Sequence, residues 1–174
     1  MYAKGLRGFI NLLLVGILTV SLSYAFVPLV NESQAKASHL LRFFKEMSWP
    51  DSAFDNVDTP IRICLLGESL NHFEPLLLDQ RVKGRTIKVL HFLETWYDLT
   101  KVDSCHLLFI SQSEQQYLSQ ILLYTQHYPI LTVSDIEDFV LEGGMIQFYK
   151  HGNKVRFMFD PQTIEEVGII VQIY

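Results

Sequence analysis

The chain has 174 residues, of which 49% are hydrophobic and 19% are charged, so its length and composition fit one globular domain with a substantial core. Lysine and arginine together number 14 against 19 for aspartate and glutamate, which gives a formal net charge of −5. This acidic balance argues against a nucleic acid as the partner.

The first 25 residues have the three regions of a secretory signal peptide. Lys4 and Arg7 precede an apolar run over residues 9–20, and the small residues of Ser23-Tyr24-Ala25 predict cleavage after Ala25. The alternative is an uncleaved anchor, because weakly polar residues prolong the apolar tract to roughly twenty residues, enough to span a bilayer. In either case we expect the remainder to be exported as a single domain over residues 26–174.

Removal of the signal peptide leaves 12 bases against 19 acids, a balance of −7. The two cysteines, Cys64 and Cys105, both lie in the exported part, where an oxidising compartment allows a disulfide. A bridge that closes about 40 residues would stabilise the fold by roughly 4 kcal/mol in the chain-entropy model. A structural bridge, a reversible redox sensor and two unbridged thiols are all compatible with this placement.

Apolar residues at three- and four-residue spacing predict a first helix, in which Ala37, Leu40, Leu41 and Phe44 face the core. The elements predicted in this half are a helix capped by Asn31 or Ser33 that ends at Trp49-Pro50, a polar link over 51–60, a strand over 61–66 that turns at Gly67, a helical segment over 68–79 interrupted at Pro75, a strand over 86–92, and a short helix near Trp96 and Tyr97.

The second half alternates in the same way. Ser111 with Glu114, and Ser134 with Glu137, have the spacing of a capping box, which predicts two helix starts. The elements predicted here are a buried strand over 106–110, a helix from Ser111 to His127, a strand over 130–133, a helix closed by Gly143-Gly144, a hairpin of 145–149 and 155–159 around Gly152-Asn153, and a last helix capped by Asp160 with Pro161 at its first position.

Strands that alternate with helices four times and then end in a hairpin predict an α/β fold. We expect a single three-layer domain, with a mostly parallel sheet of about six strands, a C-terminal antiparallel hairpin and helices on both faces. The predicted strand order is second, first, third, fourth and then the hairpin. This order places Cys64 on the first strand and Cys105 at the start of its neighbour, so a bridge between them is sterically feasible.

The carboxyl ends of parallel strands are where open sheets bind ligands, and Gly67 and Glu68 follow the first strand there, with Ser111 after the third. This stretch lacks any phosphate-binding pattern, so a plain strand-to-helix turn is the alternative. We therefore state Gly67, Glu68 and Ser111 as candidate ligand-binding residues only.

Catalytic and metal sites are not indicated by any pattern. The sequence has no G-x-S-x-G elbow, and Ser69, Ser111 and Ser134 all fit as helix caps. Asp135 and Glu137 favour a helix start by their charge. The histidines are scattered without metal-ligand spacing. We expect no enzyme activity, no metal and no cofactor.

Trp49 and Phe54 flank Pro50 and are candidates for a partner-binding patch. The alternative is a hydrophobic clamp beneath the first helix. The terminal hairpin is a further candidate for the contact surface.

Six blocks of the sequence resemble the YfiR/HmsC-like family of small periplasmic proteins, in the family order and spacing over about residues 39–168. The blocks are HLLRFFKEMSWPDSAF, IRICLLGE, VKGRTIKV, CHLLFIS, PILTVSDIEDFVLEGGMIQF and VRFMFD. The resemblance implies a mixed sheet flanked by helices, and a non-enzymatic periplasmic regulator. Such a regulator binds the periplasmic region of an inner-membrane diguanylate cyclase of the YfiN type and represses cyclic-di-GMP synthesis, with consequences for biofilm and exopolysaccharide.

The resemblance also implies roles for individual positions. Cys64 and Cys105 match the family cysteines associated with a redox-responsive disulfide. Other signature positions are Trp49-Pro50, Gly67, Gly84, Asp135 and Gly143-Gly144. The chain departs from the family in lacking a second cysteine pair in its C-terminal half, and in ending at VQIY where members continue with a Leu-rich segment.

Two hypotheses follow. In the first, the protein is an exported repressor of a membrane cyclase, released by an envelope signal. In the second, it is a periplasmic small-molecule-binding module of an uptake or sensor system, with a pocket near Gly67, Glu68 and Ser111. Either is compatible with a homodimer, and neither involves a nucleic acid.

Overall fold

The computed structural model describes residues 32–68, 70–93 and 99–172. The predicted signal peptide, the predicted cap Asn31 and the predicted short helix around Trp96 and Tyr97 lie outside these residues. The boundaries of the domain at residues 26–174 therefore stay a prediction.

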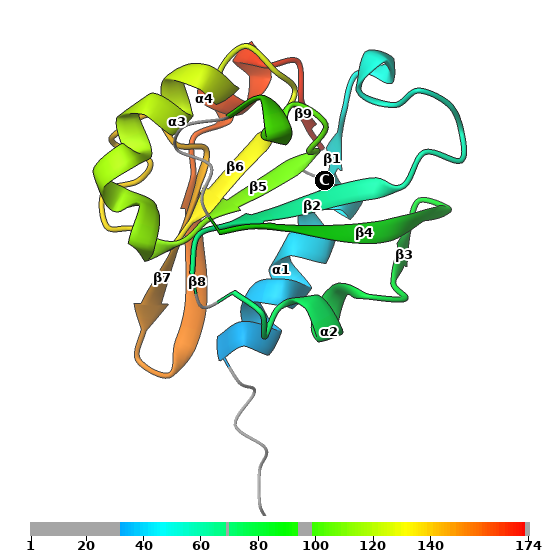
Figure 1. Cartoon of the computed structure of the whole chain (residues 1–174). Coiled ribbons are helices and arrows are strands. Elements are labelled where there is room, and N and C mark those ends of the chain that lie inside the picture. The colour runs from blue at the N-terminus through cyan, green and yellow to red at the C-terminus, as the bar shows by residue number, and fades with distance from the viewer. Residues whose placement is uncertain (1–31, 69, 94–98, 173–174) are drawn as a thin grey trace, which may run out of the picture.

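A seven-stranded, mostly parallel sheet forms the centre of the fold (Figure 1). Its order is β3-β4-β2-β5-β6-β7-β8, where β2, β4, β5, β6 and β7 run parallel and β3 and β8 are antiparallel to their neighbours. The strands are β2 (Ile61–Leu66), β3 (Arg81–Val82), β4 (Arg85–Phe92), β5 (Leu107–Ile110), β6 (Leu131–Ser134), β7 (Ile146–His151) and β8 (Lys154–Phe159). The predicted α/β class, strand order and terminal hairpin are confirmed, and β3 is one strand more than expected.

The central strands divide the interior into two hydrophobic cores. Leu107 and Phe109 of β5 point into the first core, and Leu108 and Ile110 point into the second, as the two-residue period of a strand requires. Both sets are buried, which explains the uninterrupted apolar run in the sequence. The helix α1 (Glu32–Glu46) and the short α2 (Glu74–Leu77) cover the first core, and α3 (Leu118–Thr125) covers the second (Figure 1).

The helix α1 buries Ala37, Leu40, Phe43 and Phe44 against the sheet and ends at Glu46. The chain continues directly into β1 (Met47–Ser48), which pairs antiparallel with β9 (Ile170–Val171) near the C-terminus. This two-stranded sheet was not predicted, because two-residue strands carry no periodicity. The helix α4 (Pro161–Glu166), which precedes β9 in the chain, begins as predicted. The carboxylate of Asp160 accepts a hydrogen bond from the Gln162 amide at 3.0 Å.

The predicted helix after Ser134 is wrong, because residues 136–143 form turns. The Ser134 hydroxyl does accept a hydrogen bond from the Ile136 amide at 3.0 Å, but it donates to the Ile110 carbonyl of β5 at 2.7 Å and so belongs to the sheet. Asp138 then adopts a left-handed conformation with φ of 60°, which ends any helical path.

Two further helices are shorter than predicted. Among the described residues of the segment over 68–79, only Glu74–Leu77 is helical, and Pro75 lies in its first turn rather than interrupting it. After Ser111 the chain forms a 3₁₀ helix over Gln112–Tyr117 before α3 begins. The Ser111 hydroxyl caps this segment, whereas Glu114 accepts a hydrogen bond from the Ser113 hydroxyl at 2.9 Å and does not complete a capping box.

Candidate functional site

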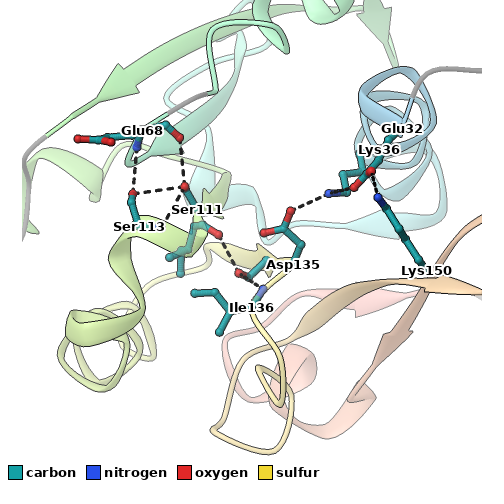
Figure 2. A network of polar contacts seen from close by, with 10 residues as sticks. Glu32, Lys36, Glu68, Ser111, Ser113, Asp135, Ile136 and Lys150 are labelled. Carbon is teal, nitrogen blue, oxygen red and sulfur yellow. Dashed lines mark hydrogen bonds and ion pairs between the residues drawn. The ribbon is translucent and has the colours of Figure 1, made fainter.

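The carboxyl ends of β2 and β5 bring Gly67, Glu68 and Ser111 together, as predicted from their places after the two strands. The Ser111 hydroxyl donates to the Glu68 carbonyl at 3.1 Å, and the Glu68 amide donates to the Ser113 hydroxyl at 3.0 Å (Figure 2). The two loops are thus joined by their own hydrogen bonds. This is the topological switch point of the sheet, because the chain passes from β2 to β4 on one side and then to β5 on the other.

Gly67 is required by this close approach. Its backbone φ is 101°, a value that residues with a side chain rarely adopt. An added Cβ would lie 2.5 Å from the Ser113 Oγ and 2.9 Å from the Ser111 Cβ. The glycine therefore lets the β2 loop and the β5 loop touch.

A cavity of about 390 Å³ lies between these loops and the start of α1, and Glu68, Ser111, Lys36 and Asp135 are among its lining residues. Lys36 is 7% exposed. Its ammonium group lies 2.6 Å from Asp135 Oδ2 and 2.7 Å from Glu32 Oε1, and Glu32 also binds Lys150 (Figure 2). A ligand in this cavity would have to compete with an ion pair that is already complete.

The ion pairs shift the pKa values of their members. Burial alone would lower the pKa of Lys36, but the hydrogen bonds to Asp135 and Glu32 outweigh it and raise that pKa above its ordinary value. The hydrogen bonds from Lys150 and Lys36 lower the pKa of Glu32. Lys36 and Glu32 are therefore both charged near neutral pH. This suits a fixed electrostatic contact between α1 and the turn after β6 better than proton transfer.

The described residues contain no group of three or more metal-ligating side chains. Ser111, Ser113 and Ser134 are engaged as hydrogen-bond partners of neighbouring backbone and hydroxyl groups, and none of them bonds to a histidine that could act as a base. The hydroxyl groups of Ser111 and Ser134 therefore serve to join neighbouring loops and strands.

A disulfide joins Cys64, in the middle of β2, to Cys105, just before β5. The Cα atoms are 5.9 Å apart, and the residues are 0% and 4% exposed. The bridge lies in the second hydrophobic core beside α3. A reductant could reach these sulfur atoms only after local opening of the sheet, so their burial favours a structural bridge over a readily accessible redox sensor.

Trp49 and Phe54 hold the segment after β1 against the sheet. The Trp49 indole donates to the His106 carbonyl at 3.0 Å and stacks on Phe44, with ring centroids 4.5 Å apart. Phe54 stacks on the His106 ring at 4.4 Å and contacts the Arg85 guanidinium at 4.0 Å. Both aromatic side chains are half-buried, so these contacts favour the clamp interpretation.

His106 is the centre of this clamp, and sequence reasoning assigned it no role. Its Nδ1 accepts a hydrogen bond from the Arg62 amide at 3.0 Å, and its Nε2 lies 2.9 Å from the Ala53 carbonyl, to which it donates in the tautomer that this pairing requires. The ring is 1% exposed, and burial lowers its pKa to about 4. A signal for this role was present in the sequence, because a histidine at the first position of a fully apolar strand must find polar partners.

Arg85 completes the same clamp. Its Nη1 donates to the carbonyl groups of Asn56, Val57 and Thr59 at 2.8, 3.0 and 2.8 Å. The link over residues 51–60 is therefore held by Arg85 on β4 and by His106 just before β5. Sequence reasoning found only the link and its aromatic residue.

The fold and these contacts together define a small α/β protein. A disulfide braces its parallel sheet, and the clamp holds the link over residues 51–60. The chain belongs to the YfiR/HmsC-like family, whose sequence model matches residues 33–172. The resemblance seen over residues 39–168 is thereby confirmed. A comparison with curated proteins found no match. Across the three described stretches of the chain, no helix is both long enough and apolar enough to cross a membrane.

We expect Gly67→Ala to lower the free energy of unfolding by about 3 kcal/mol, because it combines backbone strain with a clash between two loops. Gly143→Ala is the matched control: its φ of 99° is nearly the same as that of Gly67, but an added Cβ would meet no atom within 4 Å. The control should lose only about 1 kcal/mol. Urea unfolding of both variants measures the difference, and equal losses would contradict a tight contact between the loops.

The buried His106 should make the fold less stable in mild acid. Its pKa is lowered in the folded state, so below pH 6.5 the unfolded chain binds a proton that the folded chain does not, and stability falls as the pH drops toward 4. We expect this group to remove about 2 kcal/mol between pH 7 and pH 5. Unfolding free energies of wild type and His106→Gln at the two pH values test this.

The variant should be less stable than wild type at pH 7 but lose about 2 kcal/mol less on acidification. His127→Gln, which changes an exposed histidine, serves as the control and should follow the wild type. A His106→Gln variant with the full pH dependence of wild type would show that another group is responsible.

Proposed function

We propose that this protein is an exported, non-enzymatic regulator that binds the periplasmic region of an inner-membrane diguanylate cyclase of the YfiN type and represses cyclic-di-GMP synthesis. The observation that carries the proposal is membership of the YfiR/HmsC-like family over residues 33–172. The predicted signal peptide and the disulfide between Cys64 and Cys105 support export to an oxidising compartment.

Repression needs no chemistry from the regulator. A cyclase that interconverts between inactive and active forms is held inactive by any protein that binds the inactive form more tightly. Each tenfold preference shifts that equilibrium by about 1.4 kcal/mol. A rigid sheet with braced loops is suited to this task, because a preorganised surface loses little conformational entropy on binding.

The Cys64–Cys105 bridge has one of two roles within this proposal. As a permanent brace, it keeps β2 and β5 in register, and the regulator binds equally well with or without reductant. As a redox switch, it would have to open before a signal could weaken binding, since both cysteines are buried. Burial favours the brace.

Affinity purification from solubilised envelope, with and without reductant, tests the proposal. We expect a membrane cyclase among the co-purifying proteins, and we expect deletion of the gene to raise cellular cyclic-di-GMP several-fold, with restoration by the wild-type gene. Absence of a cyclase together with unchanged cyclic-di-GMP would overturn the proposal.

The double variant Cys64→Ser/Cys105→Ser separates the two roles of the bridge. If the bridge is a brace, the variant is less stable by about 4 kcal/mol in the chain-entropy model, but folded molecules still recover the cyclase. If it is a switch, the folded variant fails to recover the cyclase, as does the reduced wild type. Circular dichroism of the purified variant shows which fraction is folded.

A second candidate function, a periplasmic small-molecule-binding module, is favoured by the cavity of about 390 Å³ beside Glu68 and Ser111. A thermal-shift screen of metabolites tests it. A compound that raises the midpoint of the wild type, but not that of a Ser111→Ala variant, would support this function. A screen in which no compound raises the midpoint counts against it.

A further inference from the structure

Residues of α1 and of β8, the last strand of the seven-stranded sheet, line a groove. We call it the α1–β8 groove. Its volume is about 850 Å³, and the lining residues with roles below are Glu32, His39, Arg42, Lys150, Lys154, Arg156 and Phe157. Arg42 and Phe157 also line an adjoining hollow of about 210 Å³ that extends to Phe159. The two hollows together follow β8 from Lys154 to Phe159.

The strand β8 has a free edge within the described part of the sheet, because it pairs with β7 on one side only. Its side chains alternate: Val155, Phe157 and Phe159 are half-buried and pack against the first core. Lys154, Arg156 and Met158 are exposed. An edge of this kind presents backbone amide and carbonyl groups to any chain that lies beside it.

The groove is positively charged, although the protein as a whole is acidic. Arg42, Lys150, Lys154 and Arg156 line it, and Glu32 is the single carboxylate among its described lining residues. Glu32 is already bound by Lys36 and Lys150.

Two of the four cations that line the groove are engaged in ion pairs, but the two on β8 are not. Arg42 pairs with Glu46 at 2.6 Å. Among the described residues, Lys154 and Arg156 have no ion-pair partner.

The floor of the groove is aromatic. His39 of α1 lies edge-on to Phe157 of β8, with ring centroids 5.1 Å apart, and Phe43 contacts the same ring. Burial, with the nearby charges of Arg42 and Arg156, lowers the pKa of His39, so this ring adds no charge near neutral pH. A chain in the groove would therefore meet an apolar floor and cationic flanks.

We propose that the α1–β8 groove binds an extended, acidic segment of a partner protein, which adds to the free edge of β8 as an eighth strand. The proposal rests on the proposed function, because it names the surface through which the regulator holds its partner. A second copy of the chain fits less well, since pairing two β8 edges would bring two unpaired sets of cations together. The groove and the adjoining hollow together follow the whole of β8, and this length favours an extended chain over a small compact anion.

The pleat of β8 indicates what such a segment looks like. Residues of an added strand beside Val155 and Phe157 would face α1 and the aromatic floor, while those beside Lys154 and Arg156 would face away from α1. The recognised sequence should therefore alternate apolar and acidic residues. Main-chain hydrogen bonds would supply much of the affinity, and the charge pattern would select the partner.

Titration of the isotope-labelled full mature protein with a synthetic peptide tests the proposal directly. The probe is the capped heptapeptide Thr-Glu-Val-Glu-Val-Glu-Thr, and the readout is the NMR shift of each backbone amide. We expect the shifts to concentrate on Lys154–Phe159 and on the side of α1 that carries His39 and Arg42. A probe with proline at the central glutamate cannot pair along its whole length, and it should bind about tenfold more weakly.

The contribution of the β8 cations to binding is tested with the double variant Lys154→Glu/Arg156→Glu. Both positions are exposed, so reversing their charges should not unfold the protein. Affinity for the probe should fall about tenfold or more. Lys88→Glu, an exposed lysine on β4 away from the groove, is the matched control and should bind as the wild type does. Circular dichroism confirms that each variant is folded.

Three results would overturn the proposal: no shifts along β8 at millimolar probe, equal binding of the proline probe, or equal binding by the charge-reversal and control variants. Sedimentation of the free protein adds a fourth, because a dimer that the probe dissociates would assign the groove to a second copy. The same variants in the cyclase purification keep the two proposals distinct. If the charge-reversal variant and the Lys88→Glu control recover equal amounts of cyclase, the proposed function stands but the proposed binding groove is overturned. If the groove binds the probe but no cyclase is recovered, the groove stands and the proposed function is overturned.

Discussion

The pairing of β2 with β5 is the constraint on which the rest of the structure depends. Both strands are buried on both faces, so their side chains divide the interior into two cores, and a slip of one residue would exchange the two sets. The register is secured at several points: the Cys64–Cys105 bridge, the His106 ring on the Arg62 amide, and the contact of Gly67 with the Ser111 loop. The clamp and the switch point are therefore two ends of one braced pair of strands.

Much of the fold could be predicted, because buried parallel strands read as short apolar runs and their crossovers are restricted in hand. The strand order, the terminal hairpin and the Asp160 cap all followed from local patterns. The features that could not be predicted depend on partners far along the chain. Ser134 has the spacing of a helix cap, yet its hydroxyl is bound to the Ile110 carbonyl of a neighbouring strand. Strands of two residues, such as β1 and β9, have no pattern to detect.

The candidate site likewise has features that could be predicted from the sequence and features that could not. Position after a parallel strand was enough to bring Gly67, Glu68 and Ser111 to one edge of the sheet. The ion pair between Lys36 and Asp135 joins residues 99 positions apart, and nothing in the local sequence marks a lysine on a helix as buried. The role of Arg85, which binds three carbonyl groups of the link over 51–60, could not be predicted for the same reason. Sequence patterns thus located the loops of the site, while the charges that position them needed the tertiary structure.

The pairing of β1 with β9 determines when this protein can finish folding. It joins residues 47–48 to residues 170–171, and the Gln172 amide adds a hydrogen bond to the Glu46 carbonyl at 2.7 Å. A chain that emerges from a ribosome or a translocation pore with its N-terminus first must wait for nearly its last described residue before α1 is tied down. During that interval, the apolar face of α1 and the uncovered side of the sheet are open to aggregation. The native state is therefore completed only after residues 170–172 have emerged. Binding to holding chaperones before that point would slow completion without changing its outcome.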